Sequence, residues 1–129
     1  MKNLNMLTFI ALILLFCSCS QEQERDMPAL NMQTIGGYVQ KGPFLNGTSI
    51  SVSEFSEEWV PTGRNFSTQI TDNKGTFELL NVTLISPYVE LEADGFYYNE
   101  VTDENATAQL TLYALSDLSD TNSLNVNVL

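Results

Sequence analysis

The stretch YVELEADGFYY, from Tyr88 to Tyr98, decides the fold class because its apolar and acidic residues alternate. The apolar positions are Val89, Leu91 and Ala93, and the acidic positions are Glu90, Glu92 and Asp94. Successive side chains of a strand point to opposite faces, so a period of two predicts a strand with one buried and one solvated face. This pattern is typical of antiparallel sheets.

The same alternation recurs on both sides of this stretch, in TSISVSEF (48–55), TFELLNV (76–82), ATAQLTLYAL (106–115) and SLNVNVL (123–129). The apolar positions of these segments are Ile50, Val52, Phe77, Leu79, Ala108, Leu110, Leu112, Leu124, Val126 and Val128. No segment after the N-terminal apolar run has a helical stripe. We therefore predict an all-β domain, an antiparallel Greek-key sandwich of about seven strands.

The sequence DNKG, Asp72 to Gly75, separates RNFSTQIT from TFELLNV. Asp, Asn and Gly accept the positive φ that tight turns require. We therefore predict a hairpin over residues 68–79, with Gly75 in the left-handed conformation and Phe77 pointing inward.

An apolar run of about ten residues, Leu7 to Phe16, follows the positively charged start of the chain. It is too short for a membrane span, which needs about 20 residues, and is typical of a helical signal peptide. The run ends in FCSC, which resembles a bacterial lipoprotein signal, where a small residue precedes the acylated cysteine. The resemblance implies lipidation of Cys19. Cleavage before Cys17 would instead place the bulky Phe16 beside the cut.

Two other interpretations of the cysteines are disfavoured. Cys17 and Cys19 are too close in sequence to close a useful disulfide loop, and Cys17 leaves with the signal peptide if Cys19 is acylated. A metal site would need further ligands, but the chain has no histidine and no other cysteine. We predict no metal and no cofactor.

We predict three parts of the chain: a signal peptide (1–18), a lipidated cysteine with a flexible acidic tether (19–33), and the sandwich (34–129). The tether sequence SQEQERD resembles the export signals of some Gram-negative surface lipoproteins, and it also fits a plain hydrophilic spacer. The predicted location is the outer membrane, on its periplasmic or extracellular face. The alternation runs to Leu129 without a turn, so we expect a C-terminal truncation.

Charge and composition exclude several function classes. The formal net charge of −11 repels nucleic acid, so no nucleic-acid partner is expected. The absence of histidine excludes Ser-His-Asp and Cys-His catalysis. Carboxylates that alternate with apolar residues are typical of a solvated face. We therefore predict a protein that is not an enzyme.

The segments GGYVQKGPFLNGTSISVSEF, FSTQITDNKGTFEL and YVELEADGFYYNEV together resemble one module family. The residues that carry the resemblance are Thr68, Ile70, Thr71, Asp72, Gly75, Phe77, Leu79, Gly95 and Phe96. The family is that of the carboxypeptidase-regulatory-like, prealbumin-like β-sandwich modules. The tail TLYALSDLSDTNSLNVNVL resembles part of larger bacterial lipoproteins that carry such a module. The resemblance implies a β-sandwich and leaves open a regulatory fragment of a larger envelope protein.

Aromatic residues are the remaining ligand candidates. Trp59 lies in the polar segment EEWVPTG, and Tyr97 and Tyr98 lie in GFYYNE. Such side chains can stack on sugars or anchor a partner, or they can cap the end of a sandwich. The predicted function is therefore a lipid-anchored, non-catalytic structural or interaction module with a membrane anchor and a glycan or protein partner. The alternative is a carbohydrate- or peptide-binding module that uses Trp59, Tyr97 and Tyr98 as a platform.

Overall fold

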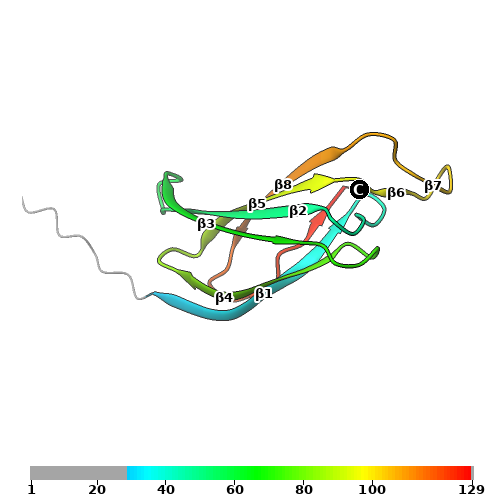
Figure 1. Cartoon of the computed structure of the whole chain (residues 1–129). Coiled ribbons are helices and arrows are strands. Elements are labelled where there is room, and N and C mark those ends of the chain that lie inside the picture. The colour runs from blue at the N-terminus through cyan, green and yellow to red at the C-terminus, as the bar shows by residue number, and fades with distance from the viewer. Residues whose placement is uncertain (1–28, 129) are drawn as a thin grey trace, which may run out of the picture.

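The computed structural model describes residues 29–128, which form nine strands and no helix (Figure 1). The strands are β1 (Leu30–Gln40), β2 (Ser49–Phe55), β3 (Pro61–Gln69), β4 (Thr76–Leu84), β5 (Tyr88–Gly95), β6 (Tyr98–Asn99), β7 (Glu104–Asn105), β8 (Leu110–Asp117) and β9 (Val126–Asn127). The prediction of an all-β domain is confirmed. The predicted signal peptide and most of the predicted tether lie outside the described residues.

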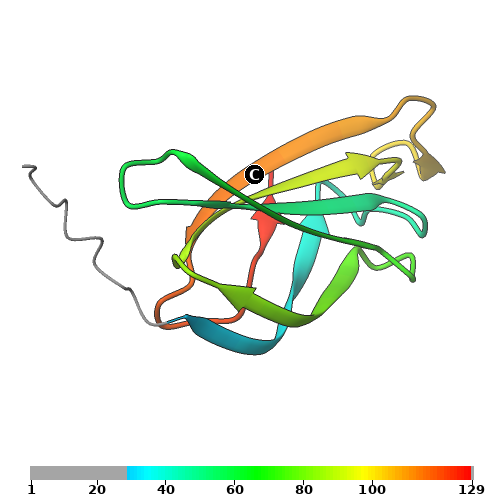
Figure 2. The ribbon, with the colours of Figure 1, turned by 60° about the vertical axis from the view of Figure 1, so that its left-hand side comes forward.

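Seven of the strands form two sheets that pack face to face, with the orders β4-β1-β9 and β3-β2-β5-β8 (Figure 2). Strands β6 and β7 form a separate two-stranded ribbon. The strand β5 lies beside β2, and β3 contacts β4 across the open edge between the sheets. The order β5-β2-β3-β4 is that of a Greek key. The predicted antiparallel Greek-key sandwich is confirmed, although β9 pairs with β1 in parallel.

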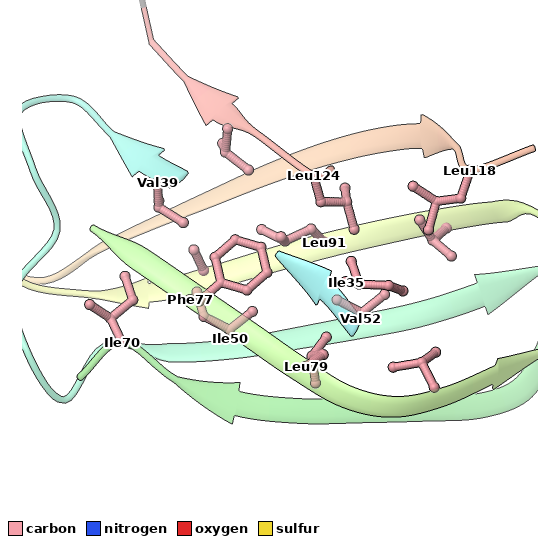
Figure 3. Close-up of a cluster of buried hydrophobic side chains, with 14 of the residues drawn as sticks. Ile35, Val39, Ile50, Val52, Ile70, Phe77, Leu79, Leu91, Leu118 and Leu124 are labelled. Atoms are coloured by element: carbon pink, nitrogen blue, oxygen red, sulfur yellow. The ribbon is translucent and has the colours of Figure 1, made fainter. Parts of the chain in front are cut away.

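The core lies between the two sheets and contains most of the apolar side chains that the alternation predicted (Figure 3). It also contains residues that the alternation did not predict: Ile35, Val39, Phe44, Ile70, Val82, Leu84 and Leu118. Strand β5 alternates buried and half-buried positions along its whole length. The predicted inward residues that the core contains are Ile50, Val52, Phe77, Leu79, Val89, Leu91, Ala93, Leu124 and Val126. Two predicted positions differ: Ala108 is exposed and precedes β8, and Val128 is 46% exposed beyond the end of β9.

The predicted hairpin over residues 68–79 is wrong, because β3 and β4 belong to different sheets. Strand β3 pairs with β2, and β4 pairs with β1, so the DNKG segment carries the chain from one sheet to the other. The local chemistry is nevertheless the predicted one. Gly75 has a φ of 79°, and a Cβ atom there would lie 2.3 Å from the Val39 carbonyl oxygen. The same residue types can form the turn of a hairpin and a connection between two sheets, so the turn sequence alone did not distinguish the two.

Asp72 stabilises the connection between β3 and β4 by hydrogen bonds and makes the stability of the fold dependent on pH. The hydroxyl and amide of Thr76 and the amide of Lys74 donate to its carboxylate. These hydrogen bonds, the Thr76 hydroxyl first, hold the pKa of Asp72 below its ordinary value of 3.8. A carboxyl whose pKa is lower in the folded state stabilises the fold above its unfolded-state pKa, and this contribution is lost as the pH falls through the folded-state pKa.

We therefore expect wild type to be more stable than Asp72→Asn at neutral pH, and the difference to shrink below pH 3.8. Urea denaturation at a series of pH values checks this, with Asp120→Asn, at an exposed carboxylate, as the control. A difference between wild type and Asp72→Asn that stays constant with pH contradicts it.

The first strand begins at Leu30, before the predicted domain boundary at Thr34. Leu30 pairs with Leu84 of β4, and both Leu30 and Met32 pack against the core. Among the side chains that the structure describes, the next buried one after Met32 is Ile35, so the alternation changes phase within the strand and the sequence shows no continuous period of two here. Strand β1 begins at the same end of the sandwich as the turn between β2 and β3, and the β6–β7 ribbon lies at the opposite end (Figure 1).

Candidate functional site

The predicted lipidation site, Cys19, and its alternative, Cys17, lie outside the described residues. Within residues 29–128, no helix is long and apolar enough to cross a membrane. The same residues contain no group of three or more acidic, histidine or cysteine side chains placed to hold a metal ion.

Trp59 lies in the turn between β2 and β3 and is 50% exposed. Its ring centroid lies 6.4 Å from that of Phe55 and 5.5 Å from that of Tyr88. Its backbone has a φ of 59°, which is rare for a bulky residue. Ser56 holds the turn closed, because its amide donates to the Val60 carbonyl at 2.8 Å and its carbonyl accepts from the Trp59 amide at 3.0 Å. Trp59 thus covers one end of the sandwich with one half of its surface and faces solvent with the other.

Tyr97 and Tyr98 lie near the other end of the sandwich and are engaged within the chain. The Tyr97 ring lies 6.0 Å from the ring of Phe44, and the Lys41 ammonium lies 5.1 Å from its centroid. The Tyr98 hydroxyl donates to the carboxylate of Asp103, and this hydrogen bond raises the pKa of Tyr98 above its ordinary value of 10.0. Both rings serve as internal contacts of this end.

The structure does not bring Trp59 together with Tyr97 and Tyr98. Phe55 pairs with Tyr88 at the Trp59 end, whereas the opposite ends of β2 and β5 lead toward Tyr97. The length of these strands separates the two groups by about 20 Å. The predicted platform that combines all three aromatics is therefore not formed.

A different aromatic residue, Tyr38, stands on the outer face of the β4-β1-β9 sheet and is 51% exposed. On one side of it lies a hollow of about 410 Å³, called the Gly36 hollow, and on the other a hollow of about 320 Å³, called the Asn125 hollow. Besides Tyr38, the Gly36 hollow is lined by Gly36, Gln69, Thr71, Thr76, Glu78 and Leu80, among others. The Asn125 hollow is lined by Gln40, Asn125, Val126 and Asn127.

The absence of a side chain at Gly36 leaves room on the β1 side of the Gly36 hollow. Gly36 pairs with Glu78, and Tyr38 pairs with Thr76, so a glycine on β1 stands among longer side chains of the neighbouring strands. A Cβ atom at Gly36 would meet only the Phe77 carbonyl oxygen at 3.5 Å and the Glu78 Cγ at 3.8 Å, which are ordinary contact distances. A glycine in a strand costs stability and often marks a place where another group approaches the backbone.

Asn125 forms the wall of the second hollow and is held in place by hydrogen bonds. Its side-chain oxygen accepts from the Tyr38 amide at 3.0 Å, and its side-chain nitrogen donates to the Ser123 hydroxyl at 3.2 Å. Asn125 thereby takes the place of a backbone partner of β1, which explains why β9 begins only at Val126. The site therefore has an ordered amide next to its exposed aromatic ring.

One buried carboxylate, that of Glu54, links the strands without forming a site. Glu54 is 0% exposed and accepts hydrogen bonds from the Thr62 hydroxyl at 2.6 Å and the Ile85 amide at 2.7 Å. These contacts join β2 to β3 and to the connection between β4 and β5. Since these partners are neutral donors of the chain itself, we assign Glu54 a structural role.

The structure defines this chain as a two-sheet β-sandwich with an exposed tyrosine between two hollows on its smaller sheet. Comparisons with protein-family models, with curated proteins and with solved structures found no match to the chain. Sequence reasoning missed Tyr38. The signal for it was an aromatic residue at an outward position of a strand, two residues after a glycine on the same face.

Proposed function

We propose that this chain is a lipid-anchored β-sandwich that acts as a non-catalytic interaction module at the bacterial outer membrane. The observation that carries the proposal is the FCSC sequence at Cys19, which resembles a lipoprotein signal, followed by a folded domain that begins at Leu30. About ten residues separate the two and reach at most about 35 Å when extended. A lipid on Cys19 would hold the sandwich close to the membrane surface.

The direction of β1 supports an interaction role for the anchored domain. The strand starts at the end of the sandwich that carries the turn between β2 and β3 (Figure 1). Tyr38 lies near the other end of the strand, which runs from Leu30 to Gln40. A membrane anchor that enters at Leu30 would therefore leave the face around Tyr38 accessible. The resemblance to carboxypeptidase-regulatory-like modules fits this role, and a regulatory fragment of a larger envelope protein stays an alternative.

A non-catalytic role is supported by the side chains that the chain offers. The sequence contains no histidine to act as a general base for a nucleophile. The carboxylates of Glu90, Glu92 and Asp94 are spaced along the outer face of β5 and are half-exposed there. Asp94 accepts a hydrogen bond from the Thr111 hydroxyl at 3.2 Å, as a surface residue does.

We expect a clickable fatty acid, fed to bacteria that express the chain, to label the wild type and not Cys19→Ala. The thioether-linked diacylglycerol requires the Cys19 thiol, and two or three acyl chains give stable anchoring where one does not. Gel fluorescence after click labelling measures this, and membrane fractionation measures the location. The matched control is Cys17→Ala, which should keep the label. Label that persists in Cys19→Ala and disappears in Cys17→Ala would mean that the cut lies before Cys17.

A further inference from the structure

We propose that the outer face of the β4-β1-β9 sheet binds a neutral glycan chain, with one sugar ring stacked on Tyr38 and its neighbours in the two adjoining hollows. The inference deepens the proposed interaction role, on which it rests, by naming the ligand class. Glycan binding at this face does not require the lipid on Cys19, so an experiment can contradict glycan binding without contradicting lipidation, and the reverse.

The shape of this face fits a chain-like ligand. Tyr38 is 51% exposed and lines both the Gly36 hollow and the Asn125 hollow. The volumes of about 410 Å³ and 320 Å³ lie within the range of about 300–1,000 Å³ that small-molecule sites occupy. A ligand that fills both hollows must pass over the tyrosine ring between them. A row of sugar units can do this, since the apolar face of a sugar packs on an aromatic ring.

The polar groups of the face are matched to uncharged hydroxyls. Of the described residues that line the two hollows, Glu78 alone is charged. The other polar groups are hydroxyls and amides, which both donate and accept hydrogen bonds, as sugar hydroxyls do. Besides Tyr38, they are Gln40, Thr68, Gln69, Thr71, Thr76, Asn125 and Asn127.

An anionic ligand is disfavoured at this face. Phosphate, sulfate and uronate groups are commonly bound by arginine or lysine, and neither residue lines the described hollows. The carboxylate of Glu78 and the net charge of −11 would both repel such a group. Glu78 can instead accept hydrogen bonds from the hydroxyls of a neutral sugar.

A peptide strand is also disfavoured here. Peptides that add to a sheet need an unpaired strand edge. Tyr38 lies on β1, the middle strand of the sheet, with β4 paired on one side and β9 on the other. The Tyr38 amide is itself engaged by Asn125. Recognition at this face must therefore come from side chains, which favours a ligand that is rich in hydroxyl groups.

The test uses the full chain, purified in a detergent without a sugar headgroup. The probes are neutral polysaccharides (β-glucan, mannan, xylan and galactan) and two anionic ones, polygalacturonate and dextran sulfate. Affinity gel electrophoresis screens the probes, and calorimetry measures Kd for oligosaccharides of those that bind. We expect at least one neutral glycan to bind, and Tyr38→Ala to weaken it about tenfold, as loss of an aromatic contact worth about 1.4 kcal/mol would do.

The matched control is Tyr113→Ala, because Tyr113 is 60% exposed on the edge strand of the other sheet. It should bind like wild type, and so should Cys19→Ala, whose loss of lipid concerns the anchor alone. The proposal is overturned if no neutral glycan binds, if Tyr38→Ala binds as tightly as wild type, or if the anionic polymers bind best. Quenching of the single tryptophan, Trp59, in step with binding would place the ligand at the other end and also overturn it.

Discussion

Phe77→Ala should unfold the sandwich or leave it barely folded. Phe77 is 3% exposed and lies on β4 between the two sheets, surrounded by core side chains such as Ile50 and Leu79 (Figure 3). Truncating a buried phenylalanine costs about 3–5 kcal/mol through lost burial and the cavity left behind. Native proteins have about 5–15 kcal/mol of stability in total, and small domains lie toward the lower end, so most of the stability should disappear. Urea denaturation followed by circular dichroism measures the effect.

Phe96→Ala is the matched control for this prediction. Phe96 is also a phenylalanine, but it is 42% exposed beyond the end of β5. We expect a loss clearly smaller than that of Phe77→Ala, since a half-exposed ring leaves no closed cavity. If Phe77→Ala is as stable as Phe96→Ala, the inward face of β4 has been assigned incorrectly.

Gly37→Ala should destabilise the fold strongly, and far more than the same substitution at Gly36. A Cβ atom at Gly37 would lie 1.7 Å from the carbonyl oxygen of Leu124, so one of the two backbones must move. Overpacking alone costs about 1–3 kcal/mol. The movement would also strain two backbone hydrogen bonds. The Gly36 amide donates to the Asn122 carbonyl at 3.1 Å, and the Leu124 amide donates to the Gly36 carbonyl at 3.0 Å. We expect a lower melting temperature and faster amide exchange at Leu124.

Gly36→Ala is the control for that substitution, one residue earlier on the same strand. A Cβ atom there meets nothing closer than the Phe77 carbonyl oxygen at 3.5 Å, which is an ordinary contact distance. Alanine in a strand loses less conformational freedom on folding than glycine does, which favours it by about 0.5–1 kcal/mol. We therefore expect Gly36→Ala to be at least as stable as wild type. Equal losses in both variants would contradict the parallel pairing of β1 with the C-terminal segment.

The inward residues of the sandwich could be predicted from the sequence because burial on one face imposes a period of two. Val89, Leu91 and Ala93 are all buried, as expected from YVELEADG. Gly75 could be predicted as well, because few other residues adopt its φ of 79°.

The assignment of strands to sheets could not be predicted in the same way. The turn after Ile70 looks like a hairpin in its residue types, but the backbone partner of β4 is β1, far earlier in the chain. The parallel pairing of Val39 with Val126 has no local signature either. Pairing between distant segments depends on the packing of the whole core, whereas turn chemistry acts only over a few residues.

The site was missed for a related reason. Trp59, Tyr97 and Tyr98 stood out because they occupy polar or strand-end segments, but they lie at opposite ends of the sandwich. Tyr38 lies inside a strand, where an aromatic residue is ordinary. Its neighbouring hollow depends on the register that sets Gly36 opposite Glu78, and no pattern within β1 alone reveals that register.

Glycan binding by Gly36→Val tests most directly whether the face around Tyr38 is the binding site. Valine is favourable in strands, and its Cβ atom fits at ordinary contact distances, 3.5 Å from the Phe77 carbonyl oxygen. Its methyl groups occupy the part of the Gly36 hollow that adjoins β1. We predict that Gly36→Val folds like wild type. In a calorimetric titration, its affinity for the neutral glycan that wild type binds should be lower by about tenfold or more, which corresponds to about 1.4 kcal/mol. A folded variant that binds this glycan with wild-type affinity would contradict the assignment.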